Sequence, residues 1–304
     1  MRLMSVEEAV RQVADGATVI IGGSGAGHAV PQLFIDTLAE VYQRDGHPRD
    51  LTTVRVVGVG DFADRGFSQL ALPGLMKRTI GSNIGNEPRL GELVKAGQIE
   101  AYSFPQGVLS LLVREIAAGR PGLVTSVGLH TYVDPRQTGG KQGAATEDLV
   151  QVVELDGREW LFFKAFPIDV AVIRGSTIDE DGNLTMEDEA IRGEMLAMAM
   201  AAHNSGGIVI AQAKRLAQAK SLRPRDVVVP GALIDIAYLD PDQTQTYYTD
   251  YSPYYAGVMR RPATGGAALP LDVRKVIARR ALLEFRPGDI CNLGFGISQS
   301  IGAI

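Results

Sequence analysis

The feature that most constrains this sequence is an apolar run that ends in glycines and is followed at once by an amphipathic stretch. Residues 17–21 (ATVII) are apolar or nearly so throughout, four glycines fall within 22–27, and Pro31 precedes periodic apolar positions over 33–41. A short, fully apolar run is typical of a strand buried in a parallel sheet, and a proline favours the first turn of a helix. The segment therefore predicts a strand, a glycine turn and a helix.

The same alternation recurs along the chain, which predicts an α/β fold built on an open, parallel-rich sheet. Asp156-Gly157, between two apolar stretches, predicts a two-residue hairpin turn. The further strands and helices that we expect are strands at 54–60, 76–81, 99–104, 123–128, 171–175, 208–214 and 227–235, and helices at 106–119 and 187–203.

Charge, apolar runs and cysteine content limit the kinds of partner and compartment that we expect for this chain. Its 304 residues carry 30 basic and 35 acidic side chains, a net charge of −5, with no long run of one sign. This balance argues against a nucleic acid or an anionic membrane as partner. No apolar run approaches the roughly 20 residues of a membrane helix, and the acidic start is not that of a signal peptide. The lone Cys291 excludes a disulfide framework and fits a reducing compartment.

Three parts of the chain are distinguished by their patterns. Residues 1–239 carry the strand and helix alternation and are expected to form a first domain, whereas 240–270 is rich in Tyr, Thr, Pro and Gly and is expected to be an irregular connection. Residues 271–304 repeat the opening plan with a helix over 271–285, a buried strand over 290–293 that contains Cys291, and a glycine turn. We therefore expect a second, related α/β domain to begin at 271.

The glycine turn at 22–27 is the first candidate site, because amides between a strand and a helix can bind an anion or an oxyanion. A tight turn without a ligand is the alternative. The turn is not a dinucleotide fingerprint, since His28 stands where glycine or alanine is needed, and the chain has no Lys-Ser/Thr pair for a P-loop.

Other polar groups give weaker signals. Residues 179–183 predict a polar turn rather than a calcium loop, because Ala190 stands where the loop needs a glutamate. The acids at 187–189 are expected to form a favourable first helical turn. His28 and His130 lie near glycine turns and are candidates to line a cleft, but no histidine spacing indicates a metal.

Several segments together resemble family I coenzyme A transferases. The resemblance spans essentially the whole chain and is closest to the single-chain branch with fused domains, which acts on short-chain acyl groups. The segments that carry it are DGATVIIGGSGAGHAVP (15–31), FPQGVLSLLVREIAAG (104–119), VGLHTYVDPRQTGGK (127–141), IRGSTIDEDGNLTMEDEA (173–190), NSGGIVIAQAKRL (204–216) and IARRALLEFRPGDICNLGFGI (277–297).

The resemblance implies two related α/β domains and ping-pong transfer of CoA between short-chain carboxylic or 3-oxo acids. A glutamate attacks the acyl-CoA thioester, the released thiolate then attacks the resulting anhydride, and a carboxylate acceptor resolves the glutamyl-CoA thioester. No metal or organic cofactor beyond CoA as substrate is implied. A cytoplasmic dimer or tetramer in short-chain fatty acid or ketone body metabolism is implied as well.

The resemblance also assigns site residues. The nucleophilic glutamate of the family lies past the segment similar to 292–297, so we expect it beyond Ile304 or on a partner chain. We therefore expect this chain to be incomplete or inactive alone, with no catalytic residue of its own; Glu87 and Glu147 are expected to be solvated charges. The residues expected to contribute to substrate binding are Gln106, Asn292, Gly22, Gly23, Gly25, Gly294 and Gly296.

Two alternatives remain open at this stage. Gln106 and Asn292 can instead cap a helix start and a strand end. The whole chain can instead belong to an acyl-CoA hydrolase, or to a non-catalytic ligand-binding domain or subunit, since a fold does not fix a function. A requirement for a carboxylate acceptor separates a transferase from a hydrolase.

Overall fold

The computed structural model describes residues 1–260, 268–294 and 296–304, which fall into two compact units, Met1–Val258 and Met259–Ile304. Part of the expected connection, 261–267, lies outside the described residues, and so does Phe295 in the expected C-terminal glycine turn.

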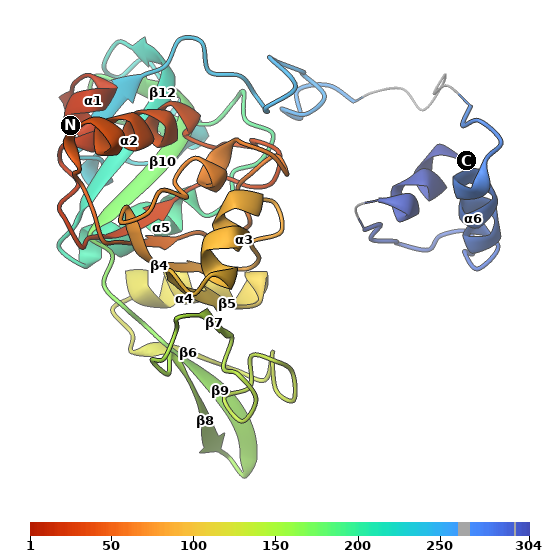
Figure 1. Cartoon of the computed structure of the whole chain (residues 1–304). Helices are drawn as coiled ribbons and strands as arrows, with labels where there is room; N and C mark the ends of the chain where they lie inside the picture. The colour runs from red at the N-terminus through yellow and green to blue at the C-terminus, as the bar shows by residue number, and fades with distance from the viewer. Residues whose placement is uncertain (261–267, 295) are drawn as a thin grey trace. The chain divides into compact units, whose positions relative to one another are not determined.

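The first unit is built on an eleven-stranded sheet in which most neighbours are parallel (Figure 1). Its main path runs β1-β14-β12-β10-β2-β3-β4-β5-β7, and β11 and β13 extend it beside β10. The expected parallel-rich α/β sheet is therefore confirmed. The strands of this sheet are β1 (Arg2–Leu3), β2 (Thr18–Ile21), β3 (Leu51–Val54), β4 (Met76–Gly81), β5 (Glu100–Ser103), β7 (Lys141–Gly143), β10 (Val170–Asp179), β11 (Leu184–Thr185), β12 (Ile208–Ala217), β13 (Val227–Val229) and β14 (Ile236–Leu239).

Helices cover both faces of this sheet and bury its apolar side chains in two core clusters. The helices α1 (Val6–Val10), α2 (Gln32–Asp45) and α3 (Pro88–Lys95) contribute to one cluster. The helices α4 (Gln106–Ala117) and α5 (Met195–Asn204) contribute to the other. All ten residues of β10 are buried, as its central place requires. Among the described residues, no helix has the length and hydrophobicity needed to span a bilayer.

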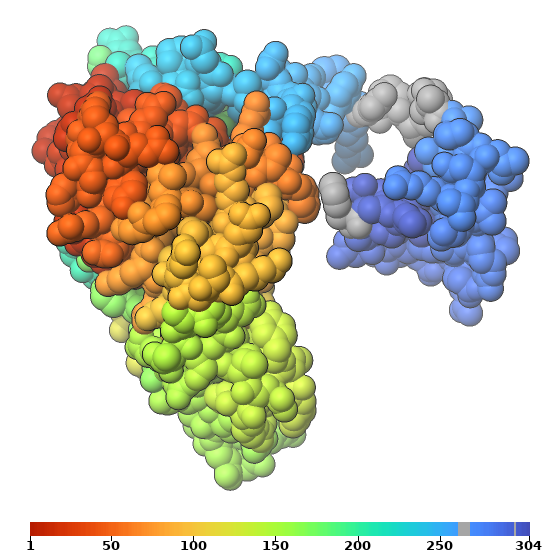
Figure 2. Space-filling view, viewed as in Figure 1, coloured from red at the N-terminus to blue at the C-terminus, as the bar shows by residue number. Residues whose placement is uncertain are grey.

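A second sheet of three antiparallel strands extends from the body of this unit, as the green surface in Figure 2 shows. It consists of β6 (Gly122–Thr125), β8 (Val150–Leu155) and β9 (Arg158–Lys164). The hairpin expected at Asp156-Gly157 is confirmed, because Leu155 pairs with Arg158 and both turn residues have positive φ. Phe163 joins this sheet to the main core through an edge-to-face contact with Phe104, with the ring centroids 5.2 Å apart.

Four expected elements of the first unit were wrong in their limits or their partners. The strand expected at 227–235 ends at Val229 and is followed by a 3-10 helix, Gly231–Leu233. The strand expected at 54–60 ends at Val54, and the chain then leaves the sheet. The helix expected from 187 begins at Met195, because the preceding acidic side chains contact β10 and β12 instead. The strand expected at 123–128 belongs to the three-stranded sheet and ends at Thr125. Side-chain partners distant in sequence hold Arg55 and the acids at 187–189, so local pattern did not reveal the limits of these two elements.

The second unit contains α6 (Val273–Leu282) and a 3-10 helix, Ile297–Ala303. The helix expected at 271–285 is thus confirmed. The strand expected at 290–293 is wrong, since those residues form no regular structure and Cys291 is exposed rather than buried. A strand needs a neighbour to pair with, and the described part of this unit contains no strand at all.

The packing of Phe163 generates a stability prediction. Phe163→Ala should lower the free energy of unfolding by about 3–5 kcal/mol, because it opens a cavity where the two sheets meet. Leu155→Ala, on the same hairpin but at a site 49% exposed, should change it by no more than about 0.5 kcal/mol. Urea unfolding followed by circular dichroism measures both, and equal effects would contradict a shared core.

Candidate functional site

The carboxyl ends of the parallel strands form one edge of the main sheet, and the strand order reverses there. The chain moves from β2 to β3, β4 and β5 on one side, and later to β10, β12 and β14 on the other. Ligands bind in open α/β sheets at the point where the order reverses. Because β2 and β10 lie side by side at that reversal, the loop that follows β2 occupies the favoured place for a site.

This loop, residues 22–28, is the glycine turn identified in the sequence. Ser24 and His28 exchange two backbone hydrogen bonds of 2.9 and 3.0 Å, and the Gly25 amide donates to the Gly58 carbonyl at 2.9 Å. The amides of Gly23 and Ala26 have no acceptor among the residues that the structure describes. Two unbonded amides in one loop at a sheet edge can receive an anion or a developing oxyanion.

Close packing explains why two of these positions are glycines. A Cβ on Gly23, whose φ is +113°, would lie 2.5 Å from a Val30 methyl carbon, and one on Gly27 would lie 2.6 Å from the Tyr247 ring. Gly22 also has a structural role, while its part in substrate binding stays a prediction. Its amide donates to the Val172 carbonyl at 2.9 Å and thus continues the sheet.

Gln106 lies on the same edge, after β5. It is the first residue of α4, its side chain is exposed, and the helix is preceded by Pro105 without a side-chain cap. The alternative that Gln106 caps its helix is therefore excluded. Gly140, from the segment 127–141, lies close to this point as well, since its carbonyl accepts from the Ser103 amide at 2.9 Å.

The other expected site residues lie in the second unit. Asn292, Gly294 and Gly296 are exposed there, and Gly296 has a φ of +111°. Because no strand forms at 290–293, Asn292 does not cap a strand end. Its part in substrate binding stays a prediction, as does that of both glycines.

Sequence reasoning missed a buried ion pair beside the glycine loop. Arg55 and Glu87 are both fully buried, with guanidinium and carboxylate 2.7 Å apart, so the expectation that Glu87 is solvated was wrong. Glu147 is exposed as expected and pairs with Arg78 at 2.8 Å. An arginine within the apolar run at 54–60 was the available signal, because a buried charge needs a partner.

A second buried pair lies on the other side of the loop. Arg174 on β10 donates to Glu189 at 2.9 Å and to the Val30 carbonyl at 2.9 Å. Burial raises the pKa of Glu189, and the charge of Arg174 opposes that rise. The expectation that residues 187–189 form a first helical turn was wrong, because the Glu187 and Asp188 carboxylates instead pair with Arg215.

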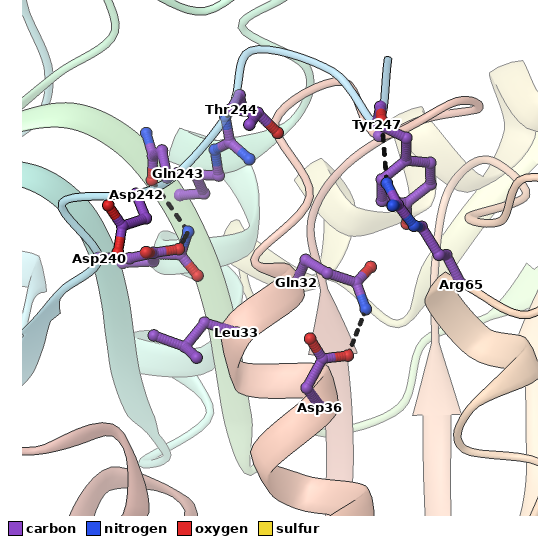
Figure 3. A pocket seen from close by; sticks show the side chains of 12 residues that line it. Gln32, Leu33, Asp36, Arg65, Asp240, Asp242, Gln243, Thr244 and Tyr247 are labelled. Atoms are coloured by element: carbon purple, nitrogen blue, oxygen red, sulfur yellow. Dashed lines mark hydrogen bonds between the residues drawn. The ribbon is translucent and has the colours of Figure 1, made fainter. Parts of the chain in front are cut away.

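A polar cavity of about 190 Å³ lies behind the glycine loop, between α2 and the ends of β10, β12 and β14 (Figure 3). Asp36, Asp240 and Asp242 contribute carboxyl groups to its wall. Burial raises the pKa of both Asp36 and Asp240. Glu189 already matches the charge of Arg174, and Arg65 is the other lining cation against three carboxyl groups, so the cavity disfavours a carboxylate ligand.

Residues 240–258 form the strap that closes one side of this cavity. The Tyr247 amide donates to the Ala26 carbonyl at 2.9 Å. Arg65 donates to the Tyr247 carbonyl at 2.9 Å (Figure 3). Arg174 reaches the same strap at the Thr244 carbonyl. The irregular connection expected here is thus fixed to the glycine loop by backbone contacts.

The histidine and acidic candidates differ in their burial and in their hydrogen-bond partners. His28 is half-buried, and burial together with the nearby Arg174 charge lowers its pKa, which leaves it neutral at pH 7. His130 is exposed in the segment before β7. Asp179 binds the Asn183 amide at 2.8 Å, as a polar turn requires. Within the described ranges, no group of three His, Cys, Asp or Glu side chains is arranged to hold a metal.

The fold and this edge define an α/β domain with a glycine loop at its switch point, in which two backbone amides have no acceptor among the described residues. A model of the coenzyme A transferase family matches residues 3–238, and the chain belongs to that family. The family expected from the sequence segments is therefore confirmed.

Individual relatives agree with this assignment. The chain is 43% identical to caffeate CoA-transferase of Acetobacterium woodii over 100% of its own length and 58% of that protein. It is 31% identical to the acetate CoA-transferase subunit alpha of Escherichia coli, over 77% of this chain and 94% of that subunit. The crystal structure of acyl-CoA transferase YdiF of Escherichia coli O157:H7 in a thioester complex with CoA matches with a TM-score of 0.93, at 40% identity, over 98% of this chain and 57% of that one. The chain thus spans somewhat more than half the length of the first and third of these proteins.

The buried carboxyl of Asp36 generates a pH prediction. Since burial raises its pKa, its charged form opposes folding at neutral pH, and this penalty is relieved as the pH falls through the raised value. Asp36→Asn keeps an acceptor for Gln32 and should raise the free energy of unfolding at pH 7. The gain should shrink as the pH approaches the ordinary aspartate value of about 3.9.

Urea titrations at several pH values measure this difference. Glu40→Gln, on the exposed side of the same helix, is the matched control and should leave stability unchanged at each pH. A gain for Asp36→Asn that grows toward low pH would contradict the sign given above.

Proposed function

We propose that this chain forms the first domain of an enzyme that transfers coenzyme A between short-chain carboxylic or 3-oxo acids. The observation that carries the proposal is the pair of unbonded amides, Gly23 and Ala26, in the loop at the switch point. Membership of the coenzyme A transferase family and the similarity to a CoA-thioester complex support it. A cytoplasmic oligomer is part of the same proposal.

The spacing of the site favours an extended substrate. Gln106 follows β5, which is three strands away from β2, so the two strand ends lie about 14 Å apart at about 4.8 Å per strand. A small acid cannot contact both ends at once, whereas an acyl-CoA can extend along the edge. Gln106 is assigned to a carboxylate substrate, and the glycine loop to the acyl carbonyl oxygen, on which negative charge develops.

The proposed reaction passes through covalent intermediates. A glutamate carboxylate attacks the thioester carbon, the C–S bond breaks, and CoA leaves as a thiolate. That thiolate attacks the glutamyl carbonyl of the mixed anhydride and expels the first acid as its carboxylate. An acceptor carboxylate then returns through the same two steps, so that bonds and charges balance. The glutamate is assigned to a position outside residues 1–304 or to a partner chain. Asn292, Gly294 and Gly296 are proposed to contribute to substrate binding.

Two other functions are separable by product analysis. A hydrolase would release the free acid from acetyl-CoA without an acceptor, and a binding domain would retain acetyl-CoA unchanged. The transferase requires an acceptor acid and yields its CoA ester. The purified protein is therefore incubated with acetyl-CoA, with and without propionate, and the CoA esters are separated by chromatography.

Peptide mapping by mass spectrometry then locates the covalent intermediate. We expect a borohydride-sensitive CoA adduct on a glutamate that is not among residues 1–304. An adduct on Glu87 or Glu147 would contradict the assignment of the nucleophile. The absence of both propionyl-CoA and any adduct, in a preparation that includes any partner chain that copurifies, would contradict the transferase.

Gln106 provides the sharpest test in this chain. Gln106→Ala should lower kcat/KM for the acceptor acid about 10- to 100-fold, as expected for the loss of a hydrogen bond to a charged group. Gln98→Ala is the matched control, because Gln98 is an exposed glutamine before the other end of β5. Equal rates for the two variants would remove Gln106 from the site.

A further inference from the structure

Arg55 is the first residue after β3, and each of the three nitrogens of its guanidinium donates a hydrogen bond. Two of its nitrogens donate to the two Glu87 carboxylate oxygens at 3.1 and 2.7 Å. The third nitrogen donates to the Thr79 hydroxyl at 2.7 Å, and one of the first two also donates to the Asn83 carbonyl at 3.0 Å. The guanidinium therefore joins the ends of β3 and β4 to the loop that follows β4.

Glu87 extends the same connection in the other direction. Its carboxylate accepts a third hydrogen bond from the Val59 amide at 2.5 Å, and its backbone immediately precedes α3. The loop over 55–60 and the loop over 82–87 are thus held by one buried ion pair. Both loops follow neighbouring strands at the edge where the site lies.

Glycine contacts carry this alignment to the glycine loop. A Cβ on Gly58 would lie 2.6 Å from the Asn83 side-chain oxygen. The 55–60 and 82–87 loops are therefore packed so closely that no side chain fits at Gly58. The Gly58 carbonyl accepts from the Gly25 amide at 2.9 Å. Gly25 lies between Gly23 and Ala26, which carry the unbonded amides. A shift of the ion pair must therefore move those amides.

We infer that Arg55 and Glu87 are positioning residues for CoA transfer, which set the alignment of the Gly23 and Ala26 amides through the Val59 and Gly58 backbone. This inference rests on the proposed function of the same edge. Neither side chain is exposed, so neither contacts the substrate. Their effect on the reaction passes through the loops that they hold.

A purely stabilising role makes a different prediction. Replacing a buried ion pair by apolar side chains of similar volume is often neutral or favourable for stability, whereas removing one partner leaves an unpaired buried charge. The double variant Arg55→Met/Glu87→Met therefore separates the two roles. It can keep the fold while it removes the acceptor of the Val59 amide and the donor to the Asn83 carbonyl.

The experiment measures thermal unfolding, amide hydrogen exchange and steady-state kinetics on the double variant. We expect faster exchange at residues 22–28 and 56–60, with exchange in β8 and β9 unchanged. We expect kcat to fall about 100-fold, the scale of a misplacement of about 1 Å, with a smaller change in KM for acyl-CoA. Leu161→Ala, in the buried core of the three-stranded sheet, is the control for lost stability and should leave kcat unchanged.

A second variant serves if the double variant does not fold. Arg55→Lys keeps the charge but not the planar guanidinium, so the variant should fold. It should still lower kcat and speed hydrogen exchange at the Val59 amide. Unaltered exchange at 56–60, or unaltered kcat in a folded variant, overturns the inference. If the unmodified protein transfers no CoA, the proposed function fails, while the exchange data still decide whether the pair holds the loops.

Discussion

Two buried arginine–glutamate pairs constrain the glycine loop from both sides, and the rest of the site depends on them. The loop follows β2, which lies between β10 and β3. Arg174 on β10 binds Glu189 and the Val30 carbonyl just past the loop. Arg55, directly after β3, binds Glu87, which in turn holds the Val59 amide. Because burying a charge without its partner is costly, neither arginine can move without its glutamate, and the backbone around the loop is held with them.

The parallel sheet explains why these contacts meet at a single edge. Strands β2, β3, β4 and β5 point the same way as β10, β12 and β14, so every strand delivers its next loop to the same side. Backbone amides in the loops after such strands have no neighbouring strand to donate to, and those that are buried need other hydrogen-bond acceptors. In the glycine loop most amides do so within the protein, and Gly23 and Ala26 do not. The free amides therefore follow from the architecture itself.

The sequence predicted the parts of the fold whose determinants are local. The apolar runs placed the core strands, Asp156-Gly157 placed the hairpin, and the glycines at 22–27 placed the switch-point loop. It failed where a partner distant in sequence decides the conformation. Glu189 binds Arg174 instead of starting a helix, and Glu87 is buried by Arg55, 32 positions away. An arginine inside an apolar run showed that a partner exists without showing which one.

The expected strand at 290–293 failed for a related reason. Its apolar residues match a buried strand, but a strand is stabilised by a neighbour, and the described second unit contains none. Local pattern thus predicts the capacity to form a strand, and pairing decides whether it forms. The same distinction separates Gln106, which is already placed by β5 and α4, from Asn292, which has no such support.

The distribution of charge behind the loop bears on how the proposed reaction is catalysed. Asp36, Asp240 and Asp242 line the inner cavity together with Arg65 and Arg174, so the excess of carboxyl groups disfavours carboxylates and thiolates there. The charge of Arg174 is matched by Glu189 and attracts them little. On the proposed function, the anionic groups of the substrate are then met chiefly by uncharged amides. Such donors bind a neutral thioester oxygen weakly and a developing oxyanion more strongly, which is the difference that accelerates a reaction.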